Sequence, residues 1–352
     1  MAMRHLITTL ALLGLSTASG GLAQVIGVPL PFMLGPLAVS ALVATVLPHR
    51  LPEGYGFPPR LRLVFIAIIG LMIGAQVTPA LFTEAHDFIY SFGALTVFVV
   101  LAHGMGYAIF RRLGGYDPVT AFYASTPGGL YESIALGEAA GADMTRLMLQ
   151  QFLRIIVVVT AVPIGLSVWL GAPVGSSAGM TMARADVPWS DLPLIAVAGV
   201  AGLGLGHMLR LPAGQLTGPM ALAAVLSLTG LLGLEIPQWL VNMAQMVLGT
   251  ALGMRFTGLS RGMILRGAGL SIVSVAMMLA LGGVFAFVLH QITSESVDVL
   301  LISFAPGGVT EMALVALSLN ANPAFVTLHH IYRILLTVLG LGVITRLRER
   351  RL

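Results

Sequence analysis

Two stretches of this chain combine a helix-breaking tripeptide, a carboxylate and an arginine at the same spacing. In each, a Pro-Gly-Gly is followed three residues later by a glutamate and, 22 residues after that, by an arginine. The first copy is Pro127, Gly128, Gly129, Glu132 and Arg154, and the second is Pro306, Gly307, Gly308, Glu311 and Arg333. A helix that restarts after such a break exposes N–H groups with partial positive charge, which bind anions. We therefore predict that these ten residues form a substrate-binding site.

The charged members of this set allow more than one interpretation. Glu132 and Glu311 fall in the first turn of the restarted helix, where the helix dipole favours a capping carboxylate. A carboxylate inside a membrane costs a few kcal/mol, which favours a functional role such as carrying a proton or contacting a cation. Arg154 and Arg333 lie too deep in apolar segments to reach water. They either clamp the broken segment, with the equivalent glutamate as first candidate partner, or bind an anion. Gln150 and His329 lie four residues before these arginines and share their helix faces.

The composition is that of a membrane protein. Apolar residues make up 57% of the 352 and charged residues only 9%, against roughly 25% charged in soluble domains. The mean hydropathy is +0.96. Apolar runs of about twenty residues recur, enough to cross a bilayer core of roughly 30 Å. This excludes an ordinary soluble protein and a disordered chain. The lipid bilayer is thus an expected partner.

The distribution of positive charge and the lack of cysteine exclude further classes of function. The net charge is +4, all 18 basic residues are arginine, and they lie mainly between apolar runs. This pattern is typical of membrane topology rather than of nucleic-acid binding. The chain has no cysteine, and its histidines show no metal-ligand spacing. We expect no cofactor, no metal and no nucleic acid.

The chain is an internal duplication. At an offset of 179 residues the two Pro-Gly-Gly segments coincide, and so do Gly70 with Gly249 and Gly74 with Gly253. Upstream, an offset of 183 pairs Gly35-Pro36 with Gly218-Pro219. Identity at proline, glycine, glutamate and arginine in fixed order is not expected by chance. We therefore divide the chain into a first membrane repeat at 1–171, a linker at 172–187 and a second membrane repeat at 188–352.

Each repeat holds six apolar segments. They cover about 5–24, 30–47, 62–82, 88–110, 118–140 and 145–171 in the first repeat, and 190–209, 214–233, 238–257, 267–290, 297–319 and 323–345 in the second. If all six crossed, a basic loop and an acidic loop would share one side, against the positive-inside rule. If the fifth segment returns to its own side, nearly all loop arginines fall in the cytoplasm and Arg184 alone lies outside. The predicted fold class is an all-α polytopic membrane protein with two inverted repeats of five transmembrane helices each, plus one re-entrant or broken helix per repeat. Both termini are then cytoplasmic.

The paired Pro-Gly-Gly-x(2)-Glu segments, the arginine after each and the Gly-Pro pairs resemble the AbrB family of membrane proteins, built from an AbrB duplication. Members have been labelled ammonia monooxygenases or transition-state regulators of gene expression. The sequence shows no convincing copper site and no soluble DNA-binding module, so neither label follows from its chemistry. The arrangement also resembles the cation–proton antiporter and anion transporter superfamily. That resemblance implies transport by an elevator-like motion of a core domain.

Two functions remain open. The first is a secondary active transporter of a small solute or ion, with an organic anion as one candidate, in the inner (plasma) membrane. The alternative is an integral membrane regulator of gene expression that acts through a partner. An enzyme would show clustered nucleophiles, bases or metal ligands, and the sequence shows none, so we expect no enzymatic activity. The sequence is also compatible with a homodimer.

Overall fold

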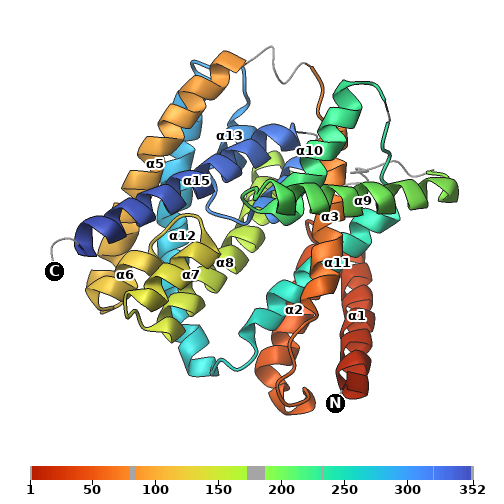
Figure 1. The fold of residues 1–352 in the computed structure, drawn as a ribbon. Helices are drawn as coiled ribbons and strands as arrows, with labels where there is room; N and C mark the ends of the chain where they lie inside the picture. The colour runs from red at the N-terminus through yellow and green to blue at the C-terminus, as the bar shows by residue number, and fades with distance from the viewer. Residues whose placement is uncertain (1, 80–84, 173–186, 232, 320, 350–352) are drawn as a thin grey trace. The chain divides into compact units, whose positions relative to one another are not determined.

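The computed structural model describes residues 2–79, 85–172, 187–231, 233–319 and 321–349. Within these residues every regular element is helical (Figure 1). The all-α class is thereby confirmed for the described part of the chain, while the inverted relation of the repeats stays a prediction. The predicted linker, 172–187, lies almost wholly outside the described residues, as does Arg184.

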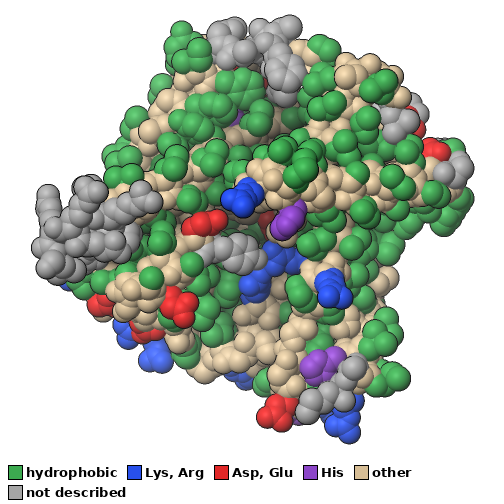
Figure 2. Space-filling model, in the orientation of Figure 1, with side chains coloured by type: hydrophobic (Ala, Val, Ile, Leu, Met, Phe, Trp, Pro, Cys, Tyr) green, Lys and Arg blue, Asp and Glu red, His purple; other side chains and the backbone are tan. Residues whose placement is uncertain are grey.

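Five helices are long and apolar enough to cross a bilayer. They are α1 (Ala2–Val25), α5 (Ala85–Arg112), α8 (Met144–Leu170), α12 (Arg261–His290) and α15 (Pro323–Glu349). The shortest, α1, has 24 residues and extends about 36 Å at 1.5 Å per residue. Large apolar side chains point outward, and Ile89 and Leu265 are each 75% exposed. Figure 2 shows hydrophobic side chains spread over much of the visible face, with charged side chains gathered near its middle and along its lower edge. The hydrophobic areas are suited to contact with lipid.

Five further helices are shorter. They are α2 (Pro31–Val46), α3 (Pro59–Ala75), α9 (Leu192–Met208), α10 (Gly214–Leu228) and α11 (Gln238–Gly253). Their 15 to 17 residues extend about 22–26 Å. That length is less than the bilayer core of roughly 30 Å. The ten-span topology depends on these helices and remains a prediction.

The two segments expected to break do break. The segment predicted at 118–140 is two helices, α6 (Pro118–Ala124) and α7 (Leu130–Ala139), which Figure 1 draws as separate coils. The segment predicted at 297–319 is α13 (Val297–Phe304) and α14 (Val309–Ser318). In both, the interruption falls on the Pro-Gly-Gly. Short 3-10 turns, η1 (Pro48–Arg50), η3 (Trp189–Asp191) and η4 (Met254–Phe256), complete the described elements.

The chain divides into two compact units that each draw on both sequence repeats. Unit 1 comprises Met1–Leu81, Thr160–Arg261 and Ala313–Ala324, and unit 2 comprises Phe82–Val159, Gly262–Met312 and Phe325–Leu352. Unit 1 contains the short helices and α1. Unit 2 contains both helix breaks and both buried arginines, so the predicted site residues lie in one compact body.

Within unit 1, glycines of one repeat pack against the backbone of the other. A Cβ on Gly70 of α3 would collide with the Leu216 carbonyl of α10. A Cβ on Gly249 of α11 would collide with the Met33 carbonyl of α2. Gly249 is the repeat equivalent of Gly70, and Leu216 is the equivalent of Met33. Each repeat therefore places a glycine against the same backbone position of the other repeat, which explains why glycine recurs at these positions.

Substitution of Gly249 tests this packing. Gly249→Leu has no space beside the Met33 backbone, so we expect a loss of at least about 1–3 kcal/mol of stability, seen as a lower melting temperature of the purified protein. Gly14→Leu is the matched control, because a Cβ there meets nothing within 4 Å. Equal melting temperatures for the two variants would contradict the close approach.

Candidate functional site

The first helix break is held from α8 by two side chains one turn apart. Gln151 donates from Nε2 to the Tyr123 carbonyl at 2.9 Å and to the Thr126 hydroxyl at 2.8 Å. Arg154 donates from a terminal nitrogen to the Thr126 carbonyl. The carbonyls at the end of α6 have lost their helical partners because the helix stops there. Gln151 and Arg154 replace those partners.

The second break is held from α15 in the same way. The His330 Nε2 lies 3.0 Å from the Ile302 carbonyl. Arg333 donates to the Ala305 carbonyl and, at 3.0 Å, to the Gly307 carbonyl. At the offset of 179, His330 corresponds to Gln151, Ile302 to Tyr123 and Ala305 to Thr126. The duplication thus preserves individual hydrogen bonds as well as residue types.

Sequence reasoning missed Gln151 and His330 and chose their neighbours instead. Gln150 donates to the Tyr116 hydroxyl at 2.9 Å and to the Gly267 carbonyl, away from the break. His329 bonds through Nδ1 to the Phe325 carbonyl and packs against phenylalanine rings. The available signal was that Gln151 and His330 are equivalent polar residues three positions before each arginine. That spacing also places two side chains on one face.

The partners of His330 determine its tautomer. A carbonyl oxygen can only accept, so Nε2 carries the proton that is donated to Ile302. Nδ1 is then the unprotonated nitrogen, and it accepts from the Arg333 guanidinium at 2.7 Å. A second proton on this ring would remove the acceptor and place two cations side by side. The geometry therefore requires a neutral His330.

The two arginines do not pair with the glutamates, contrary to our expectation of an equivalent glutamate as first partner. In the described part of the chain neither Arg154 nor Arg333 forms an ion pair, and their hydrogen bonds go to carbonyls and to His330. The carboxylates lie elsewhere. A Cβ on Gly308 would collide with the Glu311 carboxylate, and one on Gly129 would lie 3.4 Å from Oε2 of Glu132. Each glutamate folds back over the glycine that precedes its own helix, as a capping carboxylate does.

The second glycines of the two motifs are needed for different reasons. Gly129 is the residue before α7 and has a φ of 62°, a left-handed conformation that costs other residues about 1–2 kcal/mol. At position 308 a larger residue would displace the Glu311 carboxylate from its place beside the glycine.

The site is electropositive and buried. The exposed fraction is 6% for Arg154 and 1% for Arg333. The Nε of each has no hydrogen-bond partner. Arg154 uses one of its five N–H donors on Thr126, which leaves most of them uncommitted. Two buried cations without an acidic partner carry a large desolvation cost that an anion would offset.

The two breaks adjoin each other inside unit 2. The position of a Cβ on Gly128, in the first break, lies 3.6 Å from Nε of Arg333 and 3.2 Å from the Thr337 hydroxyl oxygen, both on α15. The arginine that holds the second break thus reaches the backbone of the first. Both Pro-Gly-Gly segments and both arginines belong to unit 2, and Gly128 of the first segment lies beside Arg333. Each glutamate lies against its own glycine.

The loop that leads into α6 is anchored outside the membrane-spanning segments. Burial raises the pKa of Tyr116, so its hydroxyl stays protonated at neutral pH and accepts from Gln150. Asp117 accepts from the backbone N–H groups of Val119 and Thr120 at 3.0 and 2.9 Å. Burial raises the pKa of Asp117, but these hydrogen bonds outweigh it and hold the pKa below its ordinary value. An ionised N-cap therefore fixes the start of α6.

In the described residues, no cluster of three or more His, Cys, Asp or Glu residues could hold a metal ion. The site thus consists of paired breaks, guanidinium groups and backbone dipoles.

Comparison with known proteins identifies the family. The family described as "Transition state regulatory protein AbrB" matches residues 32–349, most of the chain. The chain belongs to the AbrB family. It is 25% identical to "Uncharacterized protein YhjN" of Bacillus subtilis (strain 168), over 95% of this chain and 91% of that protein. It is 27% identical to "Putative regulator AbrB" of Escherichia coli (strain K12), over 90% of this chain and 89% of that protein. The resemblance seen in the sequence is confirmed at the level of the family.

Exchange of His330 tests its role at the second break. Glutamine serves the same purpose at position 151, so we expect His330→Gln to keep a near-native melting temperature. His330→Ala removes the ring donor from the Ile302 carbonyl, which then keeps only the Ala305 N–H, and should lose about 0.5–1.5 kcal/mol of stability. Melting of the purified variants by intrinsic fluorescence distinguishes them. If both variants melt together well below the native protein, the carbonyl bond is not what His330 contributes.

Proposed function

We propose that this AbrB-family protein is a secondary active transporter of a small organic anion. The observation that carries the proposal is that two helix breaks in one compact unit each hold a buried guanidinium group without an acidic partner. Helix breaks that meet inside a membrane protein are typical of transporter substrate sites. Breaks at membrane depth occur only where the backbone is buried or lines a cavity. The substrate would be bound by Arg154, Arg333 and the N-terminal ends of α7 and α14.

The division into units supports a moving-body mechanism. Both breaks and both arginines belong to unit 2, whereas the glycine-packed short helices belong to unit 1. We propose that unit 2 is the body that carries the anion and that unit 1 is the scaffold. We also propose an inverted duplication in the inner (plasma) membrane with both termini cytoplasmic, because nearly all loop arginines then lie on the cytoplasmic side. On this proposal the protein is not an enzyme.

Neutralising a buried arginine tests anion binding. We expect Arg154→Gln to lower uptake of the transported anion into proteoliposomes by at least about 30-fold, because the loss of one partner of a buried ionic interaction costs about 2–5 kcal/mol. The readout is uptake across a panel of carboxylates under an imposed proton or sodium gradient. Arg146→Gln is the matched control, because Arg146 lies on the same helix with a half-exposed side chain that pairs with Asp143 at 3.3 Å. Equal uptake by the two variants would overturn the proposal.

The glutamates are the candidates for energy coupling. We propose that Glu132 or Glu311 takes up a proton or contacts a cation when the anion site changes its exposure. In that case Glu132→Gln and Glu311→Gln should abolish gradient-driven accumulation while exchange of labelled for unlabelled anion persists. If both variants still accumulated the anion fully, the proposed coupling role would be wrong, and only a helix-capping role would remain for the two carboxylates.

The name of the Escherichia coli relative, together with the family description, favours a second function. A membrane regulator of gene expression would act through a protein partner. A deletion strain then separates the two functions. If its transcription changes while the purified protein moves no solute across a wide panel, regulation takes precedence over transport.

A further inference from the structure

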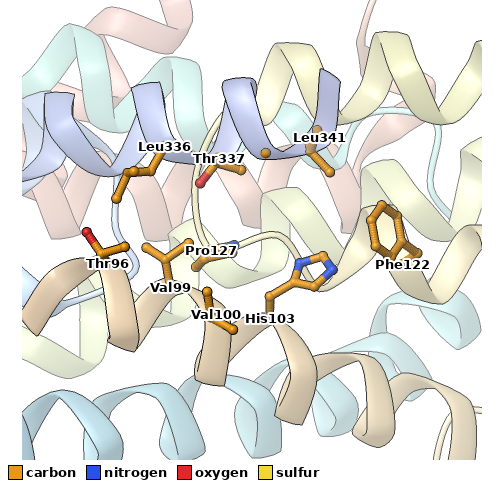
Figure 3. A pocket seen from close by; sticks show the side chains of 10 residues that line it. Thr96, Val99, Val100, His103, Phe122, Pro127, Leu336, Thr337 and Leu341 are labelled. Atoms are coloured by element: carbon orange, nitrogen blue, oxygen red, sulfur yellow. The ribbon is translucent and has the colours of Figure 1, made fainter. Parts of the chain in front are cut away.

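Unit 2 contains a cavity beside the first helix break. Its volume is about 210 Å³. Its walls come from α5, α15, the end of α6 and the break itself. Figure 3 shows Val99, Val100 and His103 on one side, Leu336 and Thr337 on the other, and Pro127 between them. The lining is almost entirely apolar, so a water molecule there would find few hydrogen-bond partners, whereas burying an apolar ligand group would be favourable in free energy.

The buried guanidinium of Arg333 lies behind the cavity wall, against Gly128. Pro127 belongs to the cavity wall, and Gly128 follows it directly. The Thr337 hydroxyl, also in the wall, and Nε of Arg333 lie 3.2 and 3.6 Å from the same point above Gly128. A ligand that fills the cavity therefore ends close to a buried cation whose Nε has no protein partner. The site offers an apolar compartment joined to an anion-binding end.

The size and shape of the cavity limit the apolar group. A protein cavity of about 150 Å³ binds benzene, so about 210 Å³ accommodates a single ring or a short branched chain. The rings of Phe122 and His103 meet edge to face with centroids 4.7 Å apart and line one end. The His103 Nε2 is buried without a partner. Aromatic walls of this kind favour a flat ring.

We propose that this cavity is the specificity pocket of the transporter and that the substrate is a monocarboxylate bearing an apolar group about as large as a benzene ring. The carboxylate binds at Arg333, and the ring occupies the cavity between α5 and α15. This inference rests on the proposed anion transport at the paired arginines and adds the substrate class. An inorganic anion or acetate would leave the cavity unfilled and would bind more weakly.

Filling the cavity tests the proposal. The probes are benzoate, acetate and benzyl alcohol, with binding measured by calorimetry on the full-length protein in lipid nanodiscs. We expect benzoate to bind at least about tenfold more tightly than acetate, because a buried ring adds hydrophobic free energy that a methyl group lacks. Benzyl alcohol, which has the ring without the charge, should bind more weakly than benzoate.

One glycine in the wall and one outside it form a matched pair of variants. Gly340 lines the cavity, Gly342 does not, and a Cβ on either meets nothing within 4 Å. Both variants should fold, because leucine is a better helix former than glycine. Gly340→Leu should reduce benzoate affinity to that of acetate and leave acetate unchanged. Gly342→Leu should change neither.

The outcomes separate this inference from the proposed function. If benzoate and acetate bind with equal affinity and Gly340→Leu changes neither, the proposed specificity pocket is overturned. Acetate uptake that depends on Arg154 would still support the proposed anion transport. No binding and no transport of any carboxylate would overturn both. If benzyl alcohol bound as tightly as benzoate, the proposal that a carboxylate binds at Arg333 would be overturned. Native mass spectrometry that finds a phospholipid displaced by Gly340→Leu but not by benzoate would assign the cavity to a lipid chain.

Discussion

The bonds between two buried guanidinium groups and the backbone carbonyls of interrupted helices are the constraint on which unit 2 depends. A helix that stops inside an apolar environment leaves carbonyls without partners, and each costs free energy unless another donor replaces the lost N–H. Arg154 supplies that donor to Thr126, and Arg333 supplies it to Ala305 and Gly307. The arginines therefore supply donors to the breaks, and the breaks supply acceptors to the buried arginines. This mutual dependence places positive charge where two helix N-termini also begin.

The duplication preserves this arrangement but not its chemistry. Gln151 and His330 occupy equivalent positions and bond equivalent carbonyls, yet only the histidine ring can bind a second proton. Arg333 makes more contacts with its break than Arg154 does, which leaves Arg154 with more uncommitted donors. The two halves of the site thus share a framework but differ in their donors, and Arg333 is held by more hydrogen bonds than Arg154.

Much of the helix plan could be read from periodicity and composition. Each of the twelve predicted segments corresponds to an observed helix or pair of helices, with ends that differ by up to seven residues, because long apolar runs ended by proline, glycine or charge have few alternatives. The motif residues were also accessible, since proline and paired glycines in an apolar segment have a direct conformational consequence. The partners of the arginines were not accessible. Sequence shows which charges are present, but not whether a guanidinium meets the glutamate or a backbone carbonyl six positions before it. The three-dimensional turn of the backbone determines which of them the guanidinium meets.

The sequence by itself determined a duplicated, all-helical chain with two interrupted segments and two deeply buried arginines, because these properties follow from local residue type and a fixed repeat offset. Only the tertiary structure decided that Arg333 lies beside Gly128 of the other repeat, that Glu132 and Glu311 turn back on their own glycines, and that α5 and α15 enclose a cavity next to Pro127. Each of these is a contact between segments far apart in the chain or a choice of side-chain direction. Such contacts depend on how whole helices pack, and residue spacing does not specify that packing.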